Sequence, residues 1–327
     1  MKIYTKIENI KNYKNYLLLI KAIEEFFKKK GYLKIDLPVL SPALIPESYL
    51  EVFETEFFYL DKKEKLYLTP SPELFLKRLL VYGVGDCYYL GKSFRNSDLP
   101  AELHSYEFTM LEFYKMDADY MSLADEVLAM LKYIDKKIKN KNLKVSFNKW
   151  EKITVAQAFK KFAQIKENEL FNQEKFLKKA ENKGYQINGF SYQDVWSQIY
   201  SQEIEPNLGT RGFPTLIYNY PKEFAALAKH NPDNKTSQRF EFYINGIELG
   251  DCYTELTDWQ EQEERFQKEF KERKKQGKIN HPIDKGFIKA LKYGLKSCSG
   301  IAIGIDRLVK VFFGLETIND YKLINIK

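Results

Sequence analysis

The sequence predicts a protein of the α+β class, containing both helices and antiparallel strands. Residues 13–30 place apolar side chains at helical spacing and end at Gly31, the residue type that commonly closes a helix. Residues 240–249 resemble two strands joined by Asn245 and Gly246, the turn pair typical of a tight hairpin. With 44% apolar and 30% charged residues, the 327-residue chain has the composition of a folded globular protein, which excludes a disordered, fibrous or repetitive one.

The remaining elements follow from local patterns. Pro38, Pro42 and Pro46 predict a strand followed by an extended loop, because proline interrupts helices. Ser71 and Pro72 are typical of a helix start. In chain order we then expect a helix at 71–80, strands at 86–94 and 106–115, a helix at 122–139, a mainly helical insertion at about 140–235, a helix at 258–278, and a glycine-punctuated strand running into a short helix in SGIAIGIDRLVKVFFG.

Composition excludes several functional classes. No apolar run approaches the ~18 residues of a membrane span, and the N-terminal segment lacks a signal-peptide pattern, so we expect a cytoplasmic protein without a membrane partner. The three cysteines and three histidines show neither disulfide nor metal-ligand spacing. The net charge of +7 reflects 52 Lys and Arg against 45 Asp and Glu, but the basic residues form no long stripe.

Arginine is scarce among the basic residues, which makes its positions informative. A genome that drifts from Arg to Lys should retain Arg where a planar guanidinium is needed, for example to hold phosphate. The seven arginines are Arg78, Arg95, Arg211, Arg239, Arg265, Arg273 and Arg307.

The segment YEFTMLEFY (106–114) has unusual polar residues for a core strand. Strand alternation places Phe108, Met110, Glu112 and Tyr114 on one face. A carboxylate, a phenol and an aromatic ring on one face suit a ligand site. A half-buried strand with a polar outer side is the alternative interpretation.

The segment GIELGDCYTELTD holds Glu248, Asp251 and Glu255 within eight residues. A flat strand would send Glu248 and Asp251 to opposite faces, but Gly250 permits a bulge that brings them together. Three acids on one strand suit a divalent cation, an ammonium group or both, whereas ordinary solvated acids remain the alternative.

The segment SGIAIGIDR alternates Gly300, Ala302 and Gly304 on one strand face, followed by Arg307 at a helix start. Such a face forms a floor almost without side chains, on which a flat ligand could lie. Close backbone packing would explain the same pattern.

Together, the three segments resemble the motifs of class II aminoacyl-tRNA synthetases. LKIDLPVLSPA resembles motif 1, with Pro38 as its dimer-interface proline, KSFRN with HSYEFTMLEFY resembles motif 2, and GIAIGIDRL resembles motif 3. FTMLEFY and IELGDCYTELTD are similar to the lysyl-tRNA synthetase core. The resemblance implies a class II catalytic core, with an antiparallel sheet flanked by helices, and a homodimer.

The chain is identified as a member of the EpmA family, truncated lysyl-tRNA synthetase paralogues that attach (R)-β-lysine to a lysine of translation elongation factor P. The segment IEPNLGTRGFPTLIYNYP and Ala302 match this family, whereas lysyl-tRNA synthetases have Gly at the latter position. The resemblance implies one catalytic domain over residues 1–327 without an anticodon-binding OB-fold, so we expect elongation factor P rather than tRNA as acceptor. An asparagine synthetase A-type ligase fits less well, since aspartate would need a basic side-chain site.

The resemblance also implies residues that bind the nucleotide. Arg95 would hold the α-phosphate of ATP, Arg307 the γ-phosphate and Phe108 the adenine, while His104 matches the histidine of the motif 2 loop. Glu112 and Glu248 match positions that bind ATP and its Mg²⁺ ions. The expected catalytic set is Arg95, Glu248 and Arg307.

A second group of residues is implied for the amino acid, lysine or (R)-β-lysine. Tyr114 and Glu255 match the pair that recognises the side-chain ammonium, and Glu73 matches the glutamate near the backbone amine. The other positions matched to the amino-acid site are Ser71, Asp251 and Ala302.

Two departures from the family pattern bear on activity. Motif 2 contains FRNSD where the family has FRNE, so Ser97 replaces a glutamate, Asp98 is a shifted substitute, and the loop arginine is absent. Asp251 replaces an asparagine close to the substrate carboxylate, where two like charges ~4 Å apart cost ~4 kcal/mol at an effective dielectric of ~20. One interpretation is that lysine or β-lysine activation is unchanged. The departures are also compatible with an altered amino-acid specificity, with a different acceptor, or with a synthetase-like protein that binds its ligands without turnover.

Overall fold

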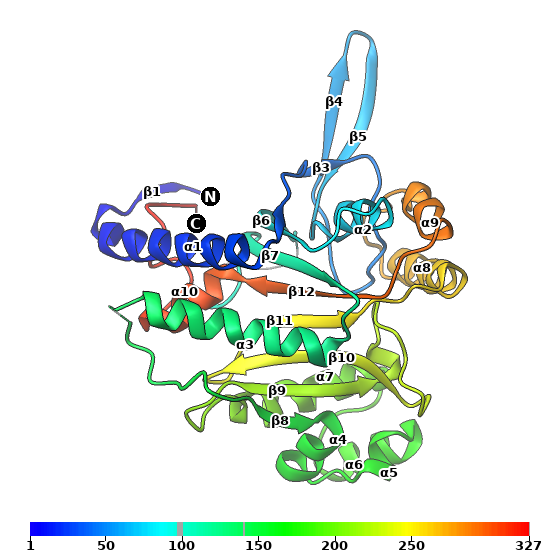
Figure 1. Ribbon diagram of the computed structural model, residues 1–327. Helices are drawn as coiled ribbons and strands as arrows, with labels where there is room; N and C mark the ends of the chain where they lie inside the picture. The colour runs from blue at the N-terminus through cyan, green and yellow to red at the C-terminus, as the bar shows by residue number, and fades with distance from the viewer. Residues whose placement is uncertain (97–100, 140, 327) are drawn as a thin grey trace.

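A computed structural model describes residues 1–96, 101–139 and 141–326, and its centre is an eight-stranded sheet (Figure 1). The six central strands are antiparallel, while the two outermost, β2 and β8, pair in parallel with their neighbours. Across the sheet the strands are β2 (Leu33–Lys34), β6 (Cys87–Phe94), β7 (Glu107–Met116), β12 (Cys298–Gly304), β11 (Ile247–Thr254), β10 (Thr236–Ile244), β9 (Thr215–Pro221) and β8 (Glu151–Thr154). The α+β class and the sheet flanked by helices are confirmed.

One face of the sheet is covered by three helices and forms the main hydrophobic core. The helices are α1 (Ile10–Lys30), α3 (Tyr120–Lys137) and α10 (Ile305–Phe313). Because strand residues alternate between faces, Leu111 and Phe113 of β7 and Ile301 and Ile303 of β12 all point into this core. Their neighbours in sequence are therefore directed to the opposite face.

That opposite face is only partly covered by helices. Around Tyr114, the helices α2 (Glu73–Val81), α8 (Trp259–Lys275) and α9 (Lys285–Lys292) pack in a second apolar cluster. Over β9 and β10, a separate cluster holds the helices of residues 155–207. These are α4 (Val155–Ala158), α5 (Glu167–Leu170), α6 (Gln173–Asn182) and α7 (Tyr192–Ile199), with π-helical turns at Phe159–Ala163 and Tyr200–Ile204 and a 3₁₀ turn at Glu205–Asn207.

This helical segment is shorter than the 140–235 range expected from the sequence. Strands β8 and β9 flank it and join the central sheet, so two parts of the expected insertion, residues 151–154 and 215–221, belong to the sheet itself. The β9 strand was missed because its residues are largely buried on both faces, which removes the alternation that identifies strands.

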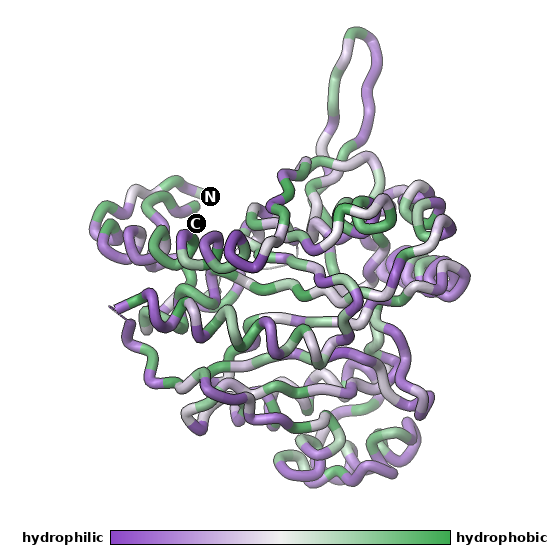
Figure 2. The backbone as a smooth tube through the Cα atoms, viewed as in Figure 1, coloured by the Kyte–Doolittle hydropathy of each residue, from purple (hydrophilic) through white to green (hydrophobic). Residues whose placement is uncertain are grey.

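Two small sheets lie outside this body. Strands β1 (Ile3–Thr5) and β13 (Ile324–Ile326) pair near the two ends of the chain. Strands β3 (Leu40–Ser41), β4 (Glu54–Tyr59) and β5 (Lys62–Leu68) form a three-stranded sheet whose β4–β5 hairpin projects from the body (Figure 1). Figure 2 shows hydrophobic residues near the tip of this hairpin, where the side chains of residues 57–60 are 51–87% exposed. Within the described residues, none of the helices has the length and hydropathy that crossing a bilayer requires.

Candidate active site

The partly open face of the sheet carries a row of polar side chains in register. Glu112 of β7 pairs with Ala302 of β12, which pairs with Asp251 of β11, which in turn pairs with Glu241 of β10. Paired residues of antiparallel strands share a face, so these side chains stand side by side. The common face predicted for Phe108, Met110, Glu112 and Tyr114 and the floor predicted for β12 belong to the same surface.

A bulge in β11 brings the two acids of GIELGD onto this surface. Tyr243 pairs with Glu248, but the next residue back on β10, Phe242, pairs with Gly250, which leaves Leu249 as the extra residue. The shift puts Glu248 and Asp251 on the same face. The predicted bulge is therefore confirmed.

Only one glycine of the β12 floor is sterically required by its neighbours. A Cβ atom on Gly300 would lie 2.3 Å from Cε1 of Tyr114 and 2.6 Å from Oε1 of Glu255. A Cβ on Gly304 would meet only the side chain of Arg307, at the ordinary distance of 3.8 Å. Gly300 thus makes room for Tyr114 and Glu255.

At one end of the surface, Glu112 is held by two hydroxyl groups. Ser71 Oγ donates to Glu112 Oε2 and Tyr114 OH donates to Oε1, each at 2.8 Å. Ser71 lies just before α2 and accepts a hydrogen bond from the backbone N–H of Glu73, so the helix begins at Glu73, two residues later than expected. Burial, together with the nearby Glu73 carboxylate, raises the pKa of Glu112 to about 8.

Lys77, which the sequence analysis did not single out, occupies the centre of this end. Its Nζ forms ion pairs of 2.5 Å with both Glu73 Oε1 and Glu255 Oε2, and its side chain is 1% exposed. Burial lowers the pKa of Lys77, but the carboxylates of Glu255 and Glu73 together outweigh this effect and raise it, so the lysine stays charged. The Glu73–Lys77 spacing of four residues on a predicted helix was the available signal. Burial raises the pKa of Glu255 to about 7, although Lys77 opposes this shift.

At the other end of the surface lie the two expected phosphate-binding arginines. The Arg95 guanidinium stacks over the Phe108 ring, with Cζ 5.2 Å from the ring centroid. Arg307 donates to the Glu248 carboxylate at 3.1 Å and to the backbone oxygens of Glu248 and Leu103. Arg307 Nη2 also lies 2.9 Å from His104 Nε2, which must accept this hydrogen bond because a guanidinium only donates.

Asp251 is compensated by an arginine that the sequence analysis did not place in the site. Arg239 donates to both carboxylate oxygens of Asp251 at 2.9 Å, and Tyr253 OH donates to Oδ2 at 2.6 Å. Burial raises the pKa of Asp251, and the bidentate pair with Arg239 opposes this shift and favours the charged form. The local negative charge inferred from the sequence is thus largely neutralised.

The same arginine extends the site into a buried network with the helical segment. Arg239 also donates to Glu241 Oε1 at 2.8 Å, and Tyr243 OH donates to Glu241 Oε2 at 2.6 Å. Tyr243 and Tyr200 are 3.3 Å apart at their hydroxyls, and Tyr200 belongs to the π-helical turn. Sequence analysis missed Glu241, although its partners Arg239 and Tyr243 lie two residues away on the same strand and strand alternation places all three side chains on one face.

Several expected residues are not brought together. Glu112 and Glu248 were both expected at Mg²⁺, but β12 lies between their strands, and neighbouring strands are about 4.8 Å apart. Glu112 also uses both of its oxygens for Ser71 and Tyr114. Ser97 and Asp98, the altered motif 2 positions, lie outside the described residues.

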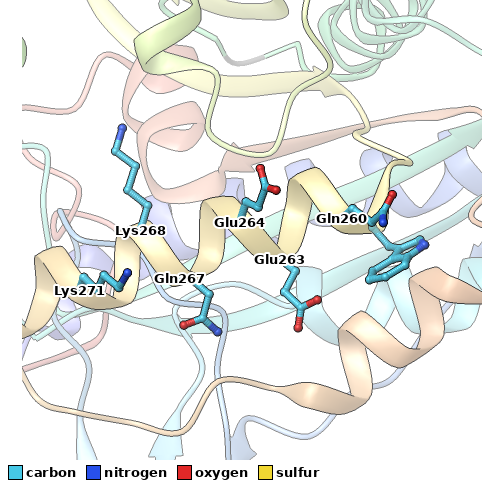
Figure 3. Close-up of a pocket in the computed structure, with 7 residues that line it drawn as sticks. Gln260, Glu263, Glu264, Gln267, Lys268 and Lys271 are labelled. Carbon is cyan, nitrogen blue, oxygen red and sulfur yellow. The ribbon is translucent and has the colours of Figure 1, made fainter.

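A surface hollow along α8 is unrelated to this face (Figure 3). It is lined by the outward side chains of one helix, which carry charges of both signs and face solvent. These residues are Trp259, Gln260, Glu263, Glu264, Gln267, Lys268 and Lys271.

Sequence comparison defines the class of protein. The profile of the family described as tRNA synthetases class II (D, K and N) matches residues 5–324, so the chain belongs to that family. It is 36% identical over 309 residues to the elongation factor P–(R)-β-lysine ligase of Hamiltonella defensa, covering 92% of this chain and 91% of that protein. It is 35% identical over 315 residues to the ligase of the same name from Avibacterium paragallinarum, covering 94% and 93%. The chain therefore belongs to the elongation factor P–(R)-β-lysine ligase group, which confirms the resemblance seen in its motifs.

Proposed function

We propose that this protein uses ATP to activate lysine or (R)-β-lysine as an adenylate and transfers it to a lysine side chain of elongation factor P. The observation that carries the proposal is the division of one sheet face into a buried acidic end and an arginine end. Glu73, Glu112 and Glu255 with Tyr114 suit the ammonium groups of a diamino acid, whereas Arg95 and Arg307 suit phosphates.

The chemistry requires alignment more than covalent help. The substrate carboxylate attacks the α-phosphorus of ATP, a P–O bond forms, and pyrophosphate leaves with the electrons of the broken P–O bond. Arg95 is assigned to the α-phosphate and Arg307 to the γ-phosphate, where their charges oppose the negative charge of the transition state. In the second step, an acceptor lysine amine attacks the acyl carbon, forming an amide and releasing AMP.

Magnesium fits the arginine end of the site. Within the described ranges, no group of three His, Cys, Asp or Glu side chains could hold a metal ion. Mg²⁺ bound with ATP needs only one or two carboxylates, because phosphates and water complete its shell. The Glu248 side chain, 35% exposed beside Arg307, meets that need. We assign Mg²⁺ contact to Glu248, where the ion would neutralise phosphate charge, and Glu112 to the ammonium pocket.

The Arg239–Asp251 pair supports unchanged rather than altered amino-acid specificity. The argument for a more positively charged substrate depended on an uncompensated carboxylate at Asp251. A buried carboxylate that already has a bidentate arginine does not need a further cation.

We also propose a homodimer formed through the motif 1 side of the molecule. The tip of the β4–β5 hairpin and residues Leu33 and Leu40 beside motif 1 expose large apolar side chains. Large apolar side chains exposed to solvent are common at protein interfaces. Light scattering is expected to give twice the chain mass, and Phe58→Ser with Leu60→Ser should shift it toward the monomer.

ATP–pyrophosphate exchange tests the proposed activity directly. The panel contains lysine, (R)-β-lysine, ornithine, arginine, aspartate and norleucine, which lacks the side-chain ammonium. We expect exchange with lysine or (R)-β-lysine and none with norleucine. Mass spectrometry of elongation factor P after incubation with the enzyme, ATP and the active amino acid should then show the added residue. Exchange with aspartate, or with no amino acid at all, would overturn the proposal.

A further inference from the structure

Lys77 is a buried cation for which the proposed reaction has no use. It lies on α2 with a 1% exposed side chain and contacts the two carboxylates, Glu73 and Glu255, that the proposed function assigns to substrate ammonium groups. A lysine side chain loses considerable conformational entropy and hydration when it is buried in this way. Its position between two functional acids therefore needs an explanation.

The two carboxylate oxygens of Glu255 face different neighbours. Oε2 of Glu255 is 2.5 Å from Lys77 Nζ. Oε1 is directed toward the floor, since a Cβ added to Gly300 would lie 2.6 Å from it. Lys77 thus holds one oxygen behind the pocket, and the other oxygen borders the bare backbone over which a ligand would lie.

We propose that Lys77 is a positioning residue of the amino-acid pocket, which fixes Glu255 and Glu73 and neutralises one of the three carboxylates gathered there. This rests on the proposed function. When all three acids are ionised, Glu73, Glu112 and Glu255 together with Lys77 leave two negative charges, which match the two ammonium groups of a diamino acid.

Removal of Lys77 should affect the remaining acids in a predictable direction. The titratable groups whose charges act on Lys77 or on its two partners are all acids or weak acids, among them Glu73 on α2, Glu112 and Tyr114 on β7, Asp251 on β11, Glu255 after β11, Cys298 on β12, and Glu47 in the loop before β4. Without the lysine, the carboxylates of Glu73 and Glu255 lose their shared counter-ion and repel each other. Glu255, whose pKa Lys77 now lowers, then binds a proton more readily, and a protonated carboxyl cannot pair with an ammonium group.

The test is Lys77→Met, which nearly preserves length and removes the charge. We expect the KM for lysine to rise at least ~10-fold at pH 7, and the pH midpoint of kcat/KM for lysine to move up by ~1 unit. The KM for ATP should stay within about threefold of wild type, because the arginine end is untouched. If Lys77→Met does not fold, Lys77→Gln, which can still donate to a carboxylate, takes its place.

Lys115→Met is the matched control. Lys115 also pairs with a buried glutamate, Glu126 at 2.9 Å, but on the opposite face of the sheet. The Lys115→Met substitution should leave the KM for lysine and the pH midpoint of kcat/KM unchanged. A Lys77→Met enzyme with an unaltered midpoint, or with equal losses for lysine and ATP, would overturn the positioning role. Absence of exchange in the wild-type enzyme would instead count against the proposed function, and calorimetric titration of lysine into both proteins would then decide the role of Lys77.

Discussion

The two ends of the candidate site are built in opposite ways. At the amino-acid end, Glu73, Glu112 and Glu255 are 1–9% exposed and already paired with Lys77, Ser71 and Tyr114. At the nucleotide end, Arg307 is partly exposed and held by Glu248, by His104 and by backbone carbonyls. The acidic end is thus already paired within the protein, whereas Arg307, in the role that we propose for it, exchanges protein partners for phosphate oxygens.

This difference indicates where specificity arises. A buried acid that loses its ammonium partner has no water to replace it, so a neutral amino acid is rejected strongly. A partly exposed arginine retains some of its hydration in the free enzyme, so each of its contacts contributes less. We therefore expect substitutions at the acidic end to have larger and more selective effects.

The largest effect is expected for Glu255→Gln. The substrate ammonium loses its charged partner, and kcat/KM for lysine in the exchange assay should fall about 10²–10³-fold, the equivalent of ~3–4 kcal/mol. The KM for ATP should remain within about threefold of wild type. Glu126→Gln, which removes a buried carboxylate on the opposite face, is the control. Equal losses for lysine and ATP would contradict the separation of the two ends.

The next effect is expected for Arg307→Lys, which keeps the charge but loses the planar fork. Charge-assisted hydrogen bonds contribute ~1.5–3 kcal/mol, so kcat/KM for ATP should fall ~10–100-fold. The lysine KM, measured at saturating ATP, should not change. If lysine binding weakens as much as ATP binding, Arg307 does not belong to a separate nucleotide end.

Sequence and structure agree on the strand faces because period-2 alternation is a local property. The face of β7, the bulge at Gly250 and the glycine floor of β12 could all be predicted from neighbouring residues. Lys77 and Arg239 could not, because their roles depend on partners supplied by other elements. The same limit explains why Asp251 looked uncompensated in the sequence.

A pH profile should reveal the acidic end without mutation. The raised pKa values of Glu255, about 7, and Glu112, about 8, mean that both are protonated at acidic pH and ionise as the pH rises. Because only the ionised forms pair with ammonium, kcat/KM for lysine should increase by up to ~10-fold per unit from pH 6 and level off above about pH 8. A flat profile between pH 6 and 9 would show that these acids are already charged throughout.

The smallest effect on specificity is expected for Asp251→Asn. Because Arg239 already neutralises Asp251, the asparagine should leave the order of preference among lysine, (R)-β-lysine and ornithine unchanged in the exchange panel. It does remove one carboxylate from a buried arginine whose side chain is 15% exposed, which should cost ~1–3 kcal/mol of stability. Thermal unfolding should therefore occur a few degrees lower, while Glu241 keeps its pairing with Arg239. If Asp251→Asn instead opens the enzyme to amino acids that the wild type rejects, Asp251 contacts the substrate, and the specificity-determining surface extends beyond the buried acidic end.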